Sequence, residues 1–538
     1  MSPLTGTGML FWLAVRRDRF LLSAWVLALT VFLFGTTHMS VVGLPTHRDL
    51  LSETHFMAAN PAMRLLSLSA GASVGAYAMS RSYVTIAILA AVMSAFTVVR
   101  HTRQNEEAGR EELLRAGVVG PAASVVAATL LALAANAVLA PLLAVAMILN
   151  GQPVGGSLAS GAAIAGVGVA FTGVAALAAQ LSSTARGANG LAMGVLGVAF
   201  MVSGIGNVLG HVDSRGLVAF SAWPTWLSPI GWGFEIRPFG GDHWWVLSLF
   251  AVFAGGLIVA AARNAARRDL GRGLLPVQTG HAEASRLLDG PLGLVWRLQR
   301  TAFVSWLIAA LGSGLIFGSV SGSARSLSGN AQQWYERVGG SSDMLAAFIT
   351  SMVQLAGMMA GIYVVQVVLR LREEEARGRL EPLLGSAVSR PRWALSYLVT
   401  AGVGAVALLV AFAAAMAFTA GQAVGGTSGF LSDVTTAALA ELPAVVVLAA
   451  CVLALLAVLP RWSVTLSWLL LAASVLLSPT FGTSLRLPEW ALKVSPFGHQ
   501  RAPALPVSWP AIAALLAVAV CLTAIGLVAF RRRDLIVG

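Results

Sequence analysis

Two short charged stretches carry the side chains whose types and spacing could do chemistry. Residues 106–121 read EEAGREELLRAGVVGP and residues 374–391 read EEARGRLEPLLGSAVSRP. In and beside each stretch, Glu is followed by Arg four residues later, which favours ion pairs along one helix face. The pairs are Glu106–Arg110, Glu111–Arg115, Glu373–Arg377 and Glu375–Arg379. A Leu-Leu pair follows in both. Solvated loop helices are one interpretation, but the recurrence favours two surfaces that dock a partner protein through charge and apolar contact.

No residue pattern in the chain is typical of catalysis. A phosphate-binding P-loop needs Gly-Lys-Ser/Thr, because its Lys reaches the β- and γ-phosphates. The only lysine is Lys493, which stands between Leu492 and Val494. The eight His residues form no HExxH motif. We therefore expect no catalytic residue, no metal site and no cofactor in this chain, and no ATP hydrolysis by the chain alone.

The charged stretches lie between long apolar runs that we expect to be membrane-spanning helices. Hydrophobic residues make up 57% of the chain, charged residues 11%, and the mean hydropathy is +0.79, whereas soluble domains have about 25% charged residues. No alternation long enough for a membrane barrel occurs, so the sequence predicts an all-α polytopic membrane protein. We count about twelve spans, at 20–36, 74–99, 122–149, 158–181, 188–210, 244–262, 301–320, 346–369, 393–420, 434–459, 462–478 and 508–530.

The distribution of basic residues predicts the orientation. With the N-terminus inside and twelve spans, 25 of the 35 Lys and Arg residues fall in inside loops, as the positive-inside rule requires. Both termini are then cytoplasmic in a multi-pass protein of a bacterial plasma membrane. The net charge of +12 does not indicate nucleic-acid binding, because the Arg residues flank spans and form no single patch.

The chain repeats itself, which predicts two parallel six-span halves. Besides the charged stretches, RFLLSAW near residue 19 matches RTAFVSW near residue 300, and both halves end on Arg-Arg-Asp-Leu, at 267–270 and 532–535. Because six spans are an even number, both halves insert in the same orientation. We predict a first half at 1–270, a cytoplasmic linker at 271–295 and a second half at 296–538.

Two further kinds of segment accompany the spans. A broken, aromatic-rich segment precedes the last span of the first half, and its counterpart in the second half has fewer aromatics. Both contain Ser-Pro-x-Gly, and we expect re-entrant or interfacial helices there. Segments 8–19 and 291–300 suggest amphipathic helices on the inner membrane surface. The outer-loop residues are Ser228, Pro229 and Gly231, with Ser495, Pro496 and Gly498 in the second copy.

The two charged stretches, the duplicated halves and the terminal Arg-Arg-Asp-Leu together resemble the permeases of actinobacterial ABC-2-type exporters, the polyketide-antibiotic (tetronasin-type) family that includes mycobacterial multidrug efflux permeases. The resemblance covers essentially the whole chain. It implies an ABC-2 (type V exporter-like) fold and two copies of a separately encoded ABC ATPase subunit, which would bind the ATP and Mg. It also implies export of hydrophobic or amphipathic drugs or antibiotics, with membrane lipid around the protein.

The resemblance also implies roles for particular residues. The short helix after the second span of each half would sit in a groove of the ATPase, and spans 2, 5, 8 and 11 would line the substrate path. The coupling helices would present Glu106, Glu107, Gly109, Arg110 and Glu112 in the first half and Glu374, Glu375, Gly378, Arg379 and Glu381 in the second. The path candidates are Phe200, Met201, Trp468 and Leu471.

Three alternatives remain open. An ion-coupled drug antiporter would need ionisable groups deep in the bundle, and Glu441, just before Pro443, is the one candidate acid. An exporter of a lipid or glycan would have the same architecture with another substrate. A membrane-embedded lipid transferase would need paired Asp or His at a membrane edge, and the sequence offers no such pair.

Overall fold

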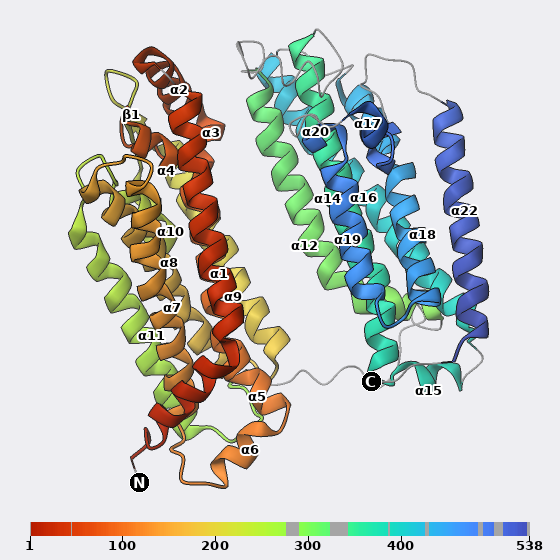
Figure 1. Cartoon of the computed structure of the whole chain (residues 1–538), viewed down its shortest axis with the longest axis horizontal. Helices are drawn as coiled ribbons and strands as arrows, with labels where there is room; N and C mark the ends of the chain where they lie inside the picture. The colour runs from red at the N-terminus through yellow and green to blue at the C-terminus, as the bar shows by residue number, and fades with distance from the viewer. Residues whose placement is uncertain are drawn as a thin grey trace. The chain divides into compact units, whose positions relative to one another are not determined.

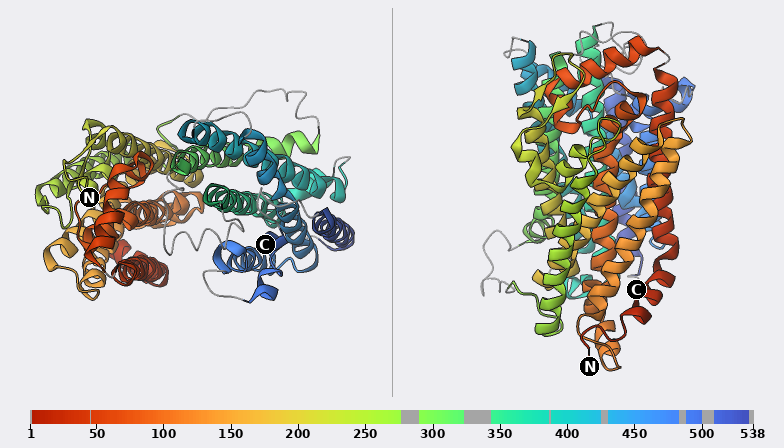
Figure 2. Two further views of the ribbon diagram at one scale, coloured as in Figure 1. Left: turned by 90° about the horizontal axis from the view of Figure 1, so that it is seen from above. Right: turned by 90° about the vertical axis from the view of Figure 1, so that its left-hand side faces the viewer.

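The computed structural model describes residues 2–44, 46–275, 290–322, 343–385, 388–424, 430–482, 488–499 and 509–534. The chain divides into two compact units, Met1–Gly280 and His281–Gly538. Each is a bundle of long helices, as Figure 1 shows, and within each unit these helices run alongside one another (Figure 2).

The first unit contains six long helices. They are α1 (Thr7–Gly43), α4 (Val74–His101), α7 (Ala123–Ile148), α8 (Val154–Leu181), α9 (Ala185–Leu209) and α11 (Leu247–Arg267). Short helices connect them at both ends of the bundle: α2 (His47–Ala59), α3 (Pro61–Leu66), α5 (Arg103–Glu107), α6 (Arg110–Arg115), η1 (Trp223–Leu227), α10 (Pro229–Glu235) and η2 (Trp244–Val246). The only sheet in the described residues is a two-residue hairpin, β1 (His211–Val212) with β2 (Ala219–Phe220).

Small residues set the packing around α4 and α8, the most buried helices of this unit. A Cβ at Gly161 of α8 would lie 2.1 Å from the carbonyl oxygen of Ala140 on α7. At Gly168 it would meet the Asn136 side chain, whose Nδ2 donates to Ser94 on α4 at 2.8 Å. These glycines let the helix backbones approach closely, as helices in membranes commonly do.

The second unit has the same general plan. Its long helices are α12 (Pro291–Val320), α14 (Met344–Ala376), α16 (Arg390–Val424), α17 with α18 (Phe430–Ala440 and Leu442–Val458) and α22 (Trp509–Arg532). Its shorter helices are α15 (Leu380–Leu384), α19 (Ser463–Leu476), α20 (Pro479–Gly482), α21 (Glu489–Leu492) and η5 (Pro496–His499). Glu441 lies at the junction of α17 and α18.

The chain is an all-α polytopic membrane protein. Among the described residues, eleven helical segments are long and apolar enough to cross a membrane, which confirms eleven of the predicted spans. The segment predicted at 462–478 forms only the 14-residue helix α19, because Pro460 and Pro479 bound it closely, and its span stays a prediction. Leu535, the last residue of the second Arg-Arg-Asp-Leu, lies outside the described residues, as does much of the predicted linker.

One sequence expectation needs correction in part. Segments 8–19 and 291–300 do not form helices of their own, because each continues into its span as one helix, α1 or α12. Their place on the inner membrane surface stays a prediction. No Gly or Pro interrupts α1 between Met9 and Phe34, so nothing in the sequence ends the helix there.

The hairpin of the first unit closes on a short loop held by one carboxylate. Asp213 accepts backbone N–H bonds from Leu217 at 2.8 Å and Val218 at 2.9 Å. These hydrogen bonds, that from Val218 foremost, hold the pKa of the half-buried Asp213 carboxyl below its usual range. The loop lies at the opposite end of the unit from α5 and α6 (Figure 1).

Candidate coupling site and substrate path

The first charged stretch forms two short helices joined at a left-handed glycine. Helix α5 follows α4 after Thr102, and Gly109, with φ +69°, separates α5 from α6. Only glycine adopts this backbone conformation readily, which makes it the usual residue just past a helix end. Gly109 therefore turns the chain, and α6 does not continue the direction of α5.

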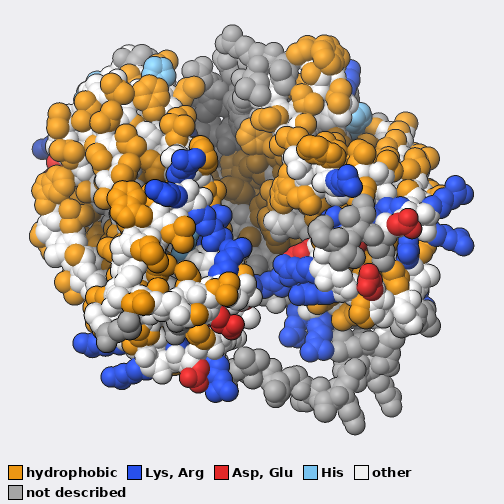
Figure 3. All heavy atoms as spheres, turned by 60° about the horizontal axis from the view of Figure 1, so that its bottom comes forward, with side chains coloured by type: hydrophobic (Ala, Val, Ile, Leu, Met, Phe, Trp, Pro, Cys, Tyr) orange, Lys and Arg blue, Asp and Glu red, His pale blue; other side chains and the backbone are white. Residues whose placement is uncertain are grey.

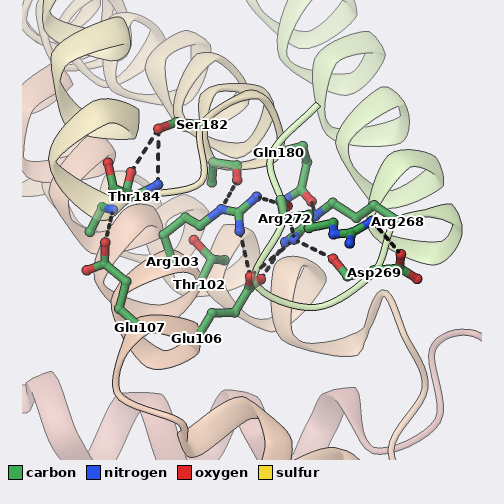
Figure 4. Close-up of polar contacts among 12 residues, drawn as sticks. Thr102, Arg103, Glu106, Glu107, Gln180, Ser182, Thr184, Arg268, Asp269 and Arg272 are labelled. Atoms are coloured by element: carbon green, nitrogen blue, oxygen red, sulfur yellow. Dashed lines mark hydrogen bonds and ion pairs between the residues drawn. The ribbon is translucent and has the colours of Figure 1, made fainter. Parts of the chain in front are cut away.

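Glu106 faces the bundle. Its carboxylate is 2.7 Å from Arg103 Nη1 and forms an ion pair with Arg268, which follows the last helix of the unit, α11 (Figure 4). Arg268 also donates from Nε to Gln180 Oε1 at 2.6 Å. The fully buried Arg103 donates to the carbonyl oxygens of Ala179 and, at 2.9 Å, Arg272. The end of α4, α8 and α11 thus meet in one buried polar junction.

Glu107 makes a different contact. Its Oε1 accepts the backbone N–H of Ala185 at 2.8 Å, at the first residue of α9 (Figure 4). A carboxylate there satisfies an unpaired helix N–H and complements the positive end of the helix dipole. The first charged stretch is therefore tied to α9 as well, the helix predicted as span 5.

The second charged stretch repeats the arrangement. Gly378, also with φ +69°, lies between α14 and α15. The buried Glu375 accepts two hydrogen bonds from Arg533, from Nη1 and Nη2 at 2.6 Å each, and is 3.6 Å from Arg372. Arg533 follows the last helix of this unit, α22. In turn the Arg533 carbonyl accepts from Arg390 Nη1 at 2.6 Å, at the start of α16.

The predicted i, i+4 ion pairs form only in part. Arg377 pairs with Glu373 at 2.6 Å, as predicted. Glu106 and Glu375 pair instead with arginines from elsewhere in the fold, and Arg379 pairs with Glu374 at 3.5 Å. The prediction for Glu375 with Arg379 is wrong because Gly378 breaks the helix and changes the register. The side chain of Arg115, the proposed partner of Glu111, lies outside the described side chains.

The predicted docking residues divide into two groups. Glu106, Glu374 and Glu375 are buried within their own units, so their carboxylates serve internal contacts. The exposed members are Glu107, Arg110, Glu112, Arg379 and Glu381, and Leu113 of the first dileucine is 78% exposed. Arginine side chains stand out against the apolar surface at this end of each unit (Figure 3). A partner would meet α6 and α15 mainly through this exposed group.

The predicted path residues have unlike surroundings. On α9, Met201 is 46% exposed while Phe200 is partly buried against the core of its unit. On α19, Leu471 is buried near Gly361 and Phe497. Trp468 lines a groove of about 530 Å³ with Gln366, Leu369, Arg461 and Val464. Met201 and Trp468 are thus the path candidates open to a molecule outside their own unit.

The two Ser-Pro-x-Gly elements make matching contacts. Ser228 Oγ donates to the carbonyl oxygen of Ala199 on α9 at 2.7 Å, and Ser495 Oγ donates to that of Ser474 on α19 at 2.6 Å. In each, the serine also accepts the N–H two residues later, at 3.2 Å. Pro229 begins α10 and Pro496 begins η5, the first-turn position that proline tolerates. Helix α10 thus packs on α9, and η5 packs on α19.

Sequence reasoning assigned no role to four arginines that organise the site. Arg103 and Arg372 stand three residues before the buried glutamates, and Arg268 and Arg533 belong to the repeated Arg-Arg-Asp-Leu. The repetition of the tetrapeptide was a signal, since it recurs at the same place in both halves. The ion-pair partners of these two arginines could not be found from the sequence. Arg268 lies 162 positions from Glu106, and Arg533 lies 158 positions from Glu375.

The long apolar helices, with charged loops at one end of each unit, define a polytopic membrane protein. A family profile described as the C-terminal domain of multidrug efflux system permease Rv1217c matches residues 288–531. The chain is also 36% identical over 550 residues to the multidrug efflux system permease protein Rv1217c of Mycobacterium tuberculosis, an alignment that covers 99% of this chain and 96% of the relative. The chain therefore belongs to this family of multidrug efflux permeases.

Proposed function

We propose that this chain is the membrane-spanning permease of an ATP-binding cassette exporter, which moves hydrophobic or amphipathic drugs or antibiotics out of the cell. Its similarity to a multidrug efflux permease over nearly its full length carries the proposal. Two copies of a separate ATPase subunit would dock on α6 and α15 and bind the ATP and Mg. The permease itself would hydrolyse no ATP.

The finer architecture belongs to the same proposal. We place a first ABC-2 half at 1–270, a linker at 271–295 and a second half at 296–538, related as a parallel 6+6 repeat. The paired glycines at φ +69° and the matching contacts of Ser228 and Ser495 support this relation. Helix α19 would be span 11 and complete the set of twelve, although 14 residues rise only about 21 Å. Both termini would then be cytoplasmic, with Phe200, Met201, Trp468 and Leu471 near the path.

The test is reconstitution with the candidate ATPase. The permease and the candidate ATPase, encoded separately, should co-purify. ATP hydrolysis that amphipathic dyes stimulate should need both chains. An ATPase variant without its P-loop lysine should bind the permease but drive no efflux from vesicles, which is the matched control. Sustained hydrolysis by the purified permease alone, or efflux without ATP, would refute the proposal.

The ion-coupled alternative has one observation in its favour. Glu441 is 3% exposed between α17 and α18, and its Oε2 accepts no hydrogen bond within the described part of the chain. A buried carboxyl of this kind can carry a proton in a transporter. Efflux driven by a pH gradient in vesicles that lack ATP would favour the antiporter.

A further inference from the structure

Each unit holds a glutamate between two arginines in the same sequence setting. One arginine comes three residues before the glutamate, and the left-handed glycine comes three residues after it. Arg103, Glu106 and Gly109 make this series in the first unit, and Arg372, Glu375 and Gly378 make it in the second. The second arginine is the second residue of Arg-Arg-Asp, directly after the last helix of the unit.

These clusters are buried, so their charges depend on one another. Side chains in the first are at most 7% exposed, and in the second at most 13%. Breaking a buried ion pair leaves an uncompensated charge away from water, which is strongly unfavourable. The two-pronged contact of Arg533 with Glu375 also fixes orientation, as paired N–H···O bonds do. The join between the charged stretch and the last helix is therefore stiff.

The surplus positive charge is accommodated locally in both units. In the first unit, carbonyl oxygens of Ala179 and Arg272 accept from Arg103. The Ala179 carbonyl belongs to the last turn of α8, the negative end of the helix dipole. In the second unit, the Arg533 guanidinium lies 4.9 Å from the ring centroid of Phe530, a cation–π contact.

We infer that Arg268 and Arg533 are positioning residues that clamp the chain just before each coupling helix to the last helix of its own unit. The clamped residues are Glu106 on α5 and Glu375 near the end of α14. The inference rests on the proposed docking of an ATPase on α6 and α15. A movement of α6 is transmitted to Glu106 because Glu106 lies on the adjoining short helix α5. The ion pair between Glu106 and Arg268 transmits the movement to α11. In the second unit, a movement of α15 reaches Glu375 at the end of α14, and Arg533 transmits it to α22. The last helix then moves with the coupling helix as one body.

Each glutamate keeps another partner when its clamp arginine is lost. Without Arg268, Glu106 keeps the close contact with Arg103 at 2.7 Å, and Glu107 still holds α9. Without Arg533, Glu375 keeps Arg372 at 3.6 Å. A Gln substitution at either arginine should therefore loosen the join while the unit stays folded.

The experiment compares variants of the permease–ATPase complex in proteoliposomes, with ethidium as the first amphipathic dye tried. For Arg533→Gln we expect normal co-purification and normal basal hydrolysis. Dye-stimulated hydrolysis and transport per ATP should fall about 5- to 150-fold, the usual range of coupling between sites. Arg532→Gln is the matched control, because Arg532 is exposed beside the clamp and its loss should leave coupling unchanged.

Two further variants separate positioning from simple stability. Arg533→Lys keeps the charge without the two-pronged geometry, so it should assemble and recover part of the coupling. Arg533→Gln added to Glu375→Gln should cost no more than Glu375→Gln alone, because Glu375→Gln already removes the interaction between the two side chains. Wild-type transport per ATP in Arg533→Gln would overturn the clamp. So would a transport loss that only tracks a lower yield of complex, in Arg533→Gln or in Arg533→Lys. Failure of the wild-type permease to bind the ATPase would instead overturn the proposed function.

Discussion

At the scale of single residues, close backbone approach fixes the outer short helices. A Cβ added at Gly231 would lie 2.0 Å from the Thr225 carbonyl oxygen, and one added at Gly498 would lie 2.0 Å from that of Leu492. Backbone atoms cannot move aside as a flexible side chain can. The glycine of Ser-Pro-x-Gly is therefore required by contact, while the serine anchors the element to the preceding long helix.

Gly231→Ala should destabilise the first unit by about 1–3 kcal/mol, the usual cost of overpacking. The measurement is the melting temperature of the purified protein in detergent. Gly194→Ala is the matched control, because nothing lies within 4 Å of its added Cβ and alanine favours a helix by up to about 1 kcal/mol. An unchanged melting temperature for Gly231→Ala would contradict the tight contact.

Glu441 offers a residue-level test of the energy source. Glu441→Gln keeps the shape of the side chain and removes its proton chemistry. We propose that ATP drives export, so dye efflux by the ATPase-containing complex should stay within about twofold of wild type. A change of this size is smaller than the roughly 5-fold effect at the low end of typical coupling between sites. A loss of efflux with ATP hydrolysis intact would show that Glu441 carries a coupling ion.

At the scale of elements, the charged stretches show what sequence patterning can and cannot predict. Their helical character, the glycine in each and the apolar dileucines were readable from the sequence. The ion pairs were not, because i, i+4 spacing assumes an unbroken helix and Gly378 ends it. Glu106 and Glu375 were thus predicted as surface groups, although distant arginines draw both into the bundle.

The exposed faces of α6 and α15 should carry the contact with the ATPase. Glu112→Lys combined with Glu381→Lys reverses two exposed charges without touching the buried clusters, so the permease should fold and insert normally. Its co-purification with the ATPase should weaken about 10-fold or more, since misplaced like charges at an interface cost several kcal/mol. Arg215→Glu, exposed at the opposite end of the first unit, is the control. Full binding by the double variant would place the docking surface elsewhere.

At the scale of the whole molecule, hydropathy was the most dependable signal. Long apolar runs predicted eleven of the spanning helices because a lipid-facing backbone must satisfy its hydrogen bonds within the helix. Helix α19 shows the limit, since its prolines leave it shorter than a full crossing. Segments 8–19 and 291–300 show another limit. Charged residues beside an apolar run do not reveal whether they form a helix of their own or continue the spanning helix. The periodicity of hydrophobic residues carries no information about the docking partner or the substrate.

The orientation in the membrane can be tested on the first unit alone. Ser214 lies exposed in the hairpin loop, and Val118, 64% exposed, lies just after α6 at the other end of the bundle. With Cys451 and Cys521 replaced by serine, Ser214→Cys should react with a membrane-impermeant maleimide in intact cells. Val118→Cys should react only after permeabilisation, because 25 of the 35 basic residues place the charged stretches inside. The reverse labelling pattern would show that the protein has the opposite orientation in the membrane. An intracellular ATPase could then dock only on the face that carries the hairpin.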